Sequence, residues 1–120
     1  MKSMIKWFGI PTVDFDRALK FYSTIFDIKM IEEEDREGGY RFANFFDPKE
    51  GMSGCIHSEH KIKPGKEGPR IYLDTFGKID DVLARVEPAG GKIIGREDIG
   101  EHGVMALVED TEGNYIGLRS

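Results

Sequence analysis

Two halves of this chain repeat the same pattern of strand and helix signals, and this repeat limits the fold more than any other feature. Asp16 matches Asp80 at a shift of 64 residues, and Met30-Ile31 matches Ile93-Ile94 at a shift of 63. A nearly constant shift over a long stretch indicates a duplicated structural unit. The expected parts are a first module over residues 1–58, a linker over 59–69 and a second module over 70–120.

Each half contains one stretch in which apolar residues recur at helical spacing. The first begins after Asp14, a residue type suited to capping the first turn of a helix. The second covers residues 79–86 and ends before Pro88-Ala89-Gly90-Gly91, which stops a helix. Strands are predicted at residues 5–10, 29–33, 40–46, 52–58, 70–75, 92–96, 104–108 and 115–119.

The order strand, helix and three strands in each half predicts an α+β fold made of two βαβββ modules. One helix covers only one face of its own sheet, so the other face remains open. We expect the open faces to form a curved mixed sheet around a cleft.

Composition excludes several classes of function. The chain has 120 residues, enough for one domain, with 39% hydrophobic and 32% charged residues, which is typical of a soluble protein. Its net charge of −5 argues against a nucleic-acid partner. No apolar run approaches the ~20 residues of a membrane-spanning helix, and no signal peptide is evident. Because Cys55 is the single cysteine, no internal disulfide can form, and we expect a cytoplasmic protein with no membrane association.

Three motifs carry a resemblance to a known family. They are residues 14–22 (DFDRALKFY), residues 89–92 (AGGK) and residues 110–114 (DTEGN). Across essentially its whole length the chain resembles the vicinal oxygen chelate superfamily, which includes glyoxalases, bleomycin-resistance proteins and extradiol dioxygenases. Residues 99–103 (IGEHG), followed by the last motif, are similar to a small bacterial glyoxalase-related subgroup.

The resemblance implies a divalent metal held by side chains from the first and last strands of each module. At three of the matching positions this chain has Trp7, Arg70 and Gly117, none of which is a usual metal ligand. The fourth position lies within residues 54–57, where His57 is the possible donor. One donor does not make a site, because zinc needs three or four and harder ions need more. The metal site is therefore expected to be degenerate, and no cofactor is predicted.

Strand alternation predicts which side chains face the cleft. Aromatic rings bind flat groups, and arginine binds carboxylates or phosphates through two parallel hydrogen bonds. We therefore predict a site for a small organic molecule, aromatic with an anionic group. Its expected residues are Trp7, His57, Arg70, Tyr72, Tyr115 and Arg119. The alternative is that these rings fill the cleft as core and that Arg70 or Arg119 pairs with an acid such as Asp74.

Other reactive side chains carry weaker hypotheses. Cys55 and His57 share one face of a strand, yet positions two apart are separated by ~7 Å, which is long for a nucleophile and its base. His60 is expected to be solvated, and His102 to serve a turn. No catalytic residue is assigned.

The sequence therefore predicts a metal-free, glyoxalase-like or bleomycin-resistance-like protein that binds a small molecule. The alternative is a lyase or isomerase related to lactoylglutathione lyase. It would use a metal held by non-standard ligands, or proton transfer by His57, Tyr72 or Tyr115. A third possibility is a structural or interaction module that binds no ligand at all. The resemblance implies a homodimer, because superfamily members with two modules commonly pair, and an open sheet face that needs cover agrees with this. Whether the cleft forms within one chain or across two stays open.

Overall fold

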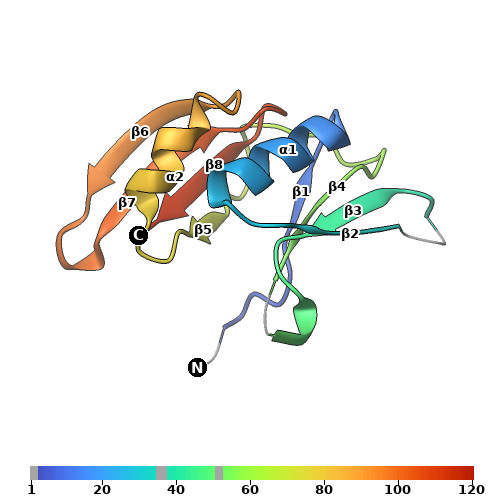
Figure 1. Cartoon of the computed structure of the whole chain (residues 1–120), viewed down its shortest axis with the longest axis horizontal. Helices are drawn as coiled ribbons and strands as arrows, with labels where there is room; N and C mark the ends of the chain where they lie inside the picture. The colour runs from blue at the N-terminus through green and yellow to red at the C-terminus, as the bar shows by residue number, and fades with distance from the viewer. Residues whose placement is uncertain (1–2, 35–37, 51–52) are drawn as a thin grey trace.

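The fold consists of two four-stranded sheets, one per module (Figure 1). The structure is a computed structural model that describes residues 3–34, 38–50 and 53–120. Module 1 comprises β1 (Gly9–Pro11), α1 (Phe15–Phe26), β2 (Ile31–Glu34), β3 (Arg41–Asn44), the 3-10 turn η1 (Pro48–Glu50) and β4 (Cys55–His57). Module 2 comprises β5 (Tyr72–Asp74), α2 (Ile79–Val86), β6 (Lys92–Asp98), η2 (Gly100–His102), β7 (Val104–Glu109) and β8 (Tyr115–Arg119). Neither helix is long and apolar enough to cross a membrane, within the part of the chain described.

Both sheets have the same topology, as the duplication predicts. Sheet A has the order β1-β4-β3-β2 and sheet B the order β5-β8-β7-β6, and in each the first strand runs parallel to the last. A hydrogen bond from the threonine that follows the first strand is also repeated in both modules. The Thr12 hydroxyl donates to the His57 carbonyl at 2.9 Å, and the Thr75 hydroxyl donates to the Arg119 carbonyl at 2.7 Å. The two-module α+β architecture is confirmed.

The core lies between the sheets and the two helices, which run next to each other on one side of the molecule (Figure 1). Asp14 caps α1 as predicted, since its side chain accepts a hydrogen bond from the Arg17 amide at 3.1 Å. Where module 2 meets α1, Gly91 allows a close approach: a Cβ there would lie 2.7 Å from the Phe21 ring and from the Glu109 carbonyl. The glycine of the AGGK motif therefore serves packing between modules.

Several strands are shorter than predicted. The strand predicted at residues 5–10 is reduced to β1, Gly9–Pro11, because β4 offers it only Cys55–His57 as partners. Pro11 was expected to follow this strand but is its last residue; an edge position leaves its missing amide without consequence. The strand predicted over 52–58 starts at a residue outside the described part. β6, in contrast, extends two residues beyond its predicted end to Asp98.

The turn at residues 110–114 joins the two modules through buried polar side chains. The Asp110 carboxylate accepts hydrogen bonds from the Glu112 and Asn114 amides within its own turn. It also accepts one from the hydroxyl of Tyr22 on α1, at 2.6 Å. Burial, and then the charge of Asp110, raise the pKa of Tyr22 well above its ordinary value. The Tyr22 hydroxyl therefore stays protonated and acts as the hydrogen-bond donor. Asn114 extends the junction by donating to the Pro11 carbonyl at 2.9 Å.

Glu112 of the same turn binds the N-terminal end of α1. Its Oε1 accepts hydrogen bonds from the Val13 and Asp14 amides at 2.8 and 2.6 Å, and its Oε2 accepts one from Arg17 Nε at 2.8 Å. Burial opposes ionisation of this carboxyl, but the bonds from Arg17 and the backbone outweigh it and lower the pKa of Glu112. A negative charge at the positive end of a helix dipole is also favourable.

Replacing Glu112 with alanine should therefore destabilise the whole fold. The Glu112→Ala variant leaves two backbone donors and the Arg17 guanidinium without their acceptor, and we expect a loss of roughly 2–4 kcal/mol in the free energy of unfolding. Urea denaturation followed by circular dichroism measures it. Glu50→Ala is the matched control, because Glu50 is exposed in the corresponding turn of module 1, and it should change stability by less than about 0.5 kcal/mol. Equal effects of the two variants would contradict this role of Glu112.

Candidate functional site

Each sheet has one face under the helices and one face free of them. On sheet A, Ile10, Ala43 and Ile56 face α1 and are buried. Alternation places Gly9, Phe42, Cys55 and His57 on the opposite face. The same division holds on sheet B, where Leu73, Ile116 and Leu118 are buried under the helices. Apolar side chains of both sheets thus alternate toward the helices.

The helix-free face of sheet A holds a pocket of about 410 Å³. It brings together two of the predicted ligand-binding residues, Trp7 and His57. The remaining lining residues are Gly9, Tyr40, Phe42, Cys55 and Glu59. Trp7 is 43% exposed, so its aromatic side chain is accessible to a ligand.

His57 is placed to act as a neutral hydrogen-bond donor in this pocket. Its Nδ1 accepts a hydrogen bond from the Glu59 amide at 3.3 Å, so the proton of the neutral ring lies on Nε2. Burial lowers the pKa of His57, and the nearby Glu59 carboxylate offsets this only in part. Gly9 provides the space for the ring, because a Cβ at that position would lie 3.2 Å from Nε2.

Cys55 lies beside His57 on the same face but does not have the character of a nucleophile. Burial raises the pKa of its thiol, with a hydrogen bond from Trp7 acting in the opposite direction. A thiol that remains protonated is a poor nucleophile. Cys55 therefore serves as a small buried side chain in the floor of the pocket.

On sheet B the predicted residues are arranged differently. The Tyr72 ring lies directly over Gly117, where any Cβ would overlap it. The position at which the resemblance implies a metal ligand is thus covered by an aromatic ring from the neighbouring strand. Arg119 donates to the His102 carbonyl at 3.1 Å, and its buried Nε has no hydrogen-bond partner among the described residues.

The two remaining predicted residues lie away from the pocket on sheet A. Arg70 is exposed and precedes β5. Tyr115 borders a crevice of about 280 Å³ between β1 and residues 62–69, and the Lys66 ammonium lies 5.7 Å from the centre of its ring. The chain therefore brings Trp7 and His57 together but distributes Arg70, Tyr72, Tyr115 and Arg119 over module 2.

The donor set does not fit the divalent metal that the resemblance implies. Trp7 and Gly117 offer no metal-binding group, and Arg70 would repel a cation. Over residues 3–34, 38–50 and 53–120, no three side chains of His, Cys, Asp or Glu lie close enough together to hold an ion. The side chains at the positions that the resemblance implies as ligands therefore do not fit a divalent ion.

Three lining residues were not predicted from the sequence: Tyr40, Phe42 and Glu59. Phe42 lies opposite His57 in the antiparallel pair of β3 and β4, and the Tyr40 ring contacts His57 edge-on, with 6.4 Å between ring centres. The sequence itself shows aromatic residues at positions 40 and 42, on the same face of a predicted strand. Which residue each one opposes depends on the register between strands, which alternation does not determine.

Comparison with known proteins agrees with the geometry. Residues 4–118 match the model of the Glyoxalase/Bleomycin resistance protein/Dioxygenase superfamily. The chain belongs to this superfamily. A comparison with curated proteins gives no significant match.

Solved structures of the superfamily share the fold. A glyoxalase/bleomycin resistance protein from Streptomyces sp. CB03234 superposes with a TM-score of 0.71 and 24% identity, over 95% of this chain and 97% of that one. TnmS3, an antibiotic-binding protein from Streptomyces sp. CB03234, gives 0.68 and 24%, over 98% and 95%. The trypanothione-dependent glyoxalase I of Leishmania major gives 0.69 and 19%, over 99% and 87%. At these identities the likeness concerns the fold alone.

The burial of His57 can be tested by its titration. NMR of the imidazole protons should show His57 titrating below its ordinary value of about 6.5, because burial disfavours the charged ring. A His57→Gln variant assigns the signal. A midpoint at or above 6.5 for that signal would contradict the environment described for this ring.

Proposed function

We propose that this protein binds a small organic molecule on the helix-free faces of its sheets, without a metal, and does so as a homodimer. The observation that carries the proposal is the aromatic pocket of Trp7 and His57 on sheet A. Pockets for small molecules are mostly apolar and contain a few placed polar groups. Here the placed polar group is the Nε2–H of the neutral His57 ring.

The class of ligand follows from the charges around the two faces. Trp7 offers a ring for stacking, and Arg70 and Arg119 supply positive charge on the helix-free side of module 2. An aromatic carboxylate or a similar anion matches both. The relative described as an antibiotic-binding protein supports a binding role, since it shares the fold over nearly the whole of both chains.

A second copy would unite the two groups of residues. The lining of the Trp7 pocket contains no residue of module 2, so Arg70 and Tyr72 of the same chain do not complete it. The accessible surface of the chain is 8063 Å². A folded monomer of 13.6 kDa is expected to expose only about 6,600 Å². The excess exceeds the ~800 Å² that each partner buries in a standard interface, which favours a dimer with a composite cleft.

The environment of Cys55 agrees with the cytoplasmic location proposed from the sequence. It is a buried, free cysteine, so the fold uses no disulfide. Proteins of reducing compartments typically keep their thiols in this form.

Trp7 is the single tryptophan, so its fluorescence reports directly on this pocket. Titration with 4-nitrobenzoate, corrected for inner-filter loss with N-acetyltryptophanamide, should quench the emission to a plateau. Arg70→Ala should weaken this binding roughly threefold to tenfold through loss of a charged hydrogen-bond donor. Arg96→Ala is the control and should leave the affinity unchanged, because Arg96 pairs with Asp80 on the helix side of sheet B.

Two results would count against the proposal. Emission that falls only linearly, as for free N-acetyltryptophanamide, would show that the pocket does not bind aromatic carboxylates. Equal loss of affinity in both arginine variants would show a non-specific effect of charge.

A further inference from the structure

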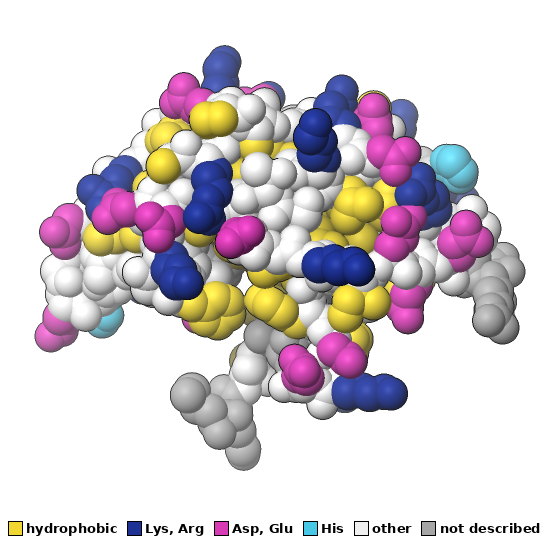
Figure 2. All heavy atoms as spheres, viewed as in Figure 1, with side chains coloured by type: hydrophobic (Ala, Val, Ile, Leu, Met, Phe, Trp, Pro, Cys, Tyr) yellow, Lys and Arg dark blue, Asp and Glu magenta, His cyan; other side chains and the backbone are white. Residues whose placement is uncertain are grey.

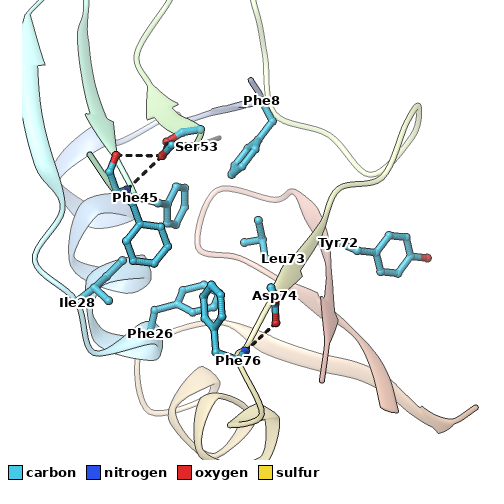
Figure 3. Close-up of a pocket in the computed structure, with 11 residues that line it drawn as sticks. Phe8, Phe26, Ile28, Phe45, Ser53, Tyr72, Leu73, Asp74 and Phe76 are labelled. Carbon is cyan, nitrogen blue, oxygen red and sulfur yellow. Dashed lines mark hydrogen bonds between the residues drawn. The ribbon is translucent and has the colours of Figure 1, made fainter. Parts of the chain in front are cut away.

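A second pocket lies at the joint between the modules, lined by residues from both of them. Its volume is about 200 Å³. Its lining includes five phenylalanines, Phe8, Phe26, Phe45, Phe46 and Phe76, and also Tyr72. Figure 3 shows the phenylalanine rings around a common space, with the Tyr72 side chain directed away from it. This pocket shares no lining residue with the Trp7 pocket on sheet A, so the two pockets are separate.

Two phenylalanine side chains at this pocket are unusually exposed. Phe76 is 66% and Phe46 is 42% exposed, and their rings meet edge-on with 6.0 Å between centres. The backbone of Phe76 has φ of 52°, a left-handed conformation that is rare for a bulky residue. Such strain persists only where the surroundings enforce it, and it concentrates at functional sites. Figure 2 shows hydrophobic side chains exposed at the lower middle of the molecule, below the helices and between the modules.

The duplicated fold explains why the pocket lies next to the segment that precedes α2. Phe76 precedes α2 as Val13 precedes α1, 63 residues earlier. At the Val13 position, Glu112 enters from module 2 and binds the backbone amides at the start of α1. At the Phe76 position, the amide is bound instead by the nearby Asp74 at 2.8 Å, and the N-cap residue of α2 makes no side-chain cap. Module 2 thus closes the Val13 position before α1, whereas the equivalent Phe76 position before α2 retains a pocket.

The polar groups near this pocket define what it can bind. Ser53 is buried, and its hydroxyl is already bonded to the backbone of Phe46, at 3.1 and 3.2 Å. Asp74 places a carboxylate at the pocket, which would repel an anion. A ligand here therefore needs neither a charge nor a hydrogen bond. An apolar cavity of about 150 Å³ is enough to bind benzene, so this one has room for a larger ring system.

We propose that this phenylalanine-lined pocket is a second binding site, specific for a small, flat, uncharged aromatic molecule of one or two rings. The site differs from the Trp7 pocket both in its lining residues and in its ligand, since the Trp7 pocket is expected to take an anion. The edge-to-face pair of Phe46 and Phe76 forms one wall, and the ligand would add a further aromatic contact against it.

The test uses 5-fluoroindole as the probe and its ¹⁹F NMR signal as the readout. The full chain should shift or broaden this signal to saturation. Phe76→Gly should weaken the affinity roughly fivefold or more by removing an aromatic wall. The same variant should leave thermal stability unchanged or raise it, since glycine accepts φ of 52° without strain. Loss of binding through unfolding is thereby separated from loss of the wall.

Two control variants locate the probe. Val13→Ala changes the equivalent exposed residue at the closed position and should leave binding unchanged. Trp7→Ala alters the pocket on sheet A and should also leave it unchanged, whereas a loss of binding in Trp7→Ala alone would place the probe there and overturn the proposal. Absence of saturable binding to the wild-type chain would overturn it as well. So would light scattering that shows Phe76→Gly converting a dimer to a monomer, because the pocket would then be part of an interface.

Discussion

The buried polar turn at residues 110–114 holds the two modules together. Asp110, Glu112 and Asn114 are each at most 6% exposed, yet all three are polar or charged. Burial of such groups is costly unless every one is bonded, and here the partners come largely from module 1. The turn therefore gains its stability only when the two modules are in their native arrangement.

This arrangement places the helices together and leaves the opposite faces of both sheets free. Because the turn binds α1 and not α2, the two halves of the joint are unequal despite their common topology. Module 2 inserts a glutamate at the start of α1, whereas within the described part of the chain no side chain caps α2. A duplicated fold can in this way carry a structural contact at one position and a pocket at the other.

The sequence predicted the parts of the fold that follow from local patterns. The 63-residue shift predicted the two modules, Asp14 was correctly assigned as the cap of α1, and β8 has its predicted bounds. The length of β1 could not be predicted, because it depends on how much of β4 is available to pair. The DTEGN turn was read as a family motif, but its bonds to Tyr22 and Pro11 connect residues about 90 to 100 positions apart, beyond any local pattern.

The candidate site was predictable only in part, for the same reason. Alternation correctly separated the helix side of each strand from the free side, yet six residues on free faces need not share one pocket. Trp7 and His57 do, since β1 and β4 are neighbours. That Tyr72 lies over Gly117 depends on the parallel register of β5 and β8, which places these two residues opposite each other.

We propose that the superfamily scaffold binds an organic molecule in this protein at the place where the resemblance implies a metal. Diffraction from crystals grown with 4-nitrobenzoate and a divalent metal such as zinc tests this proposal. We expect density for the aromatic acid against Trp7 and His57, and no anomalous signal from an ion bound by the helix-free faces. A strong anomalous peak held by protein side chains on those faces would contradict it.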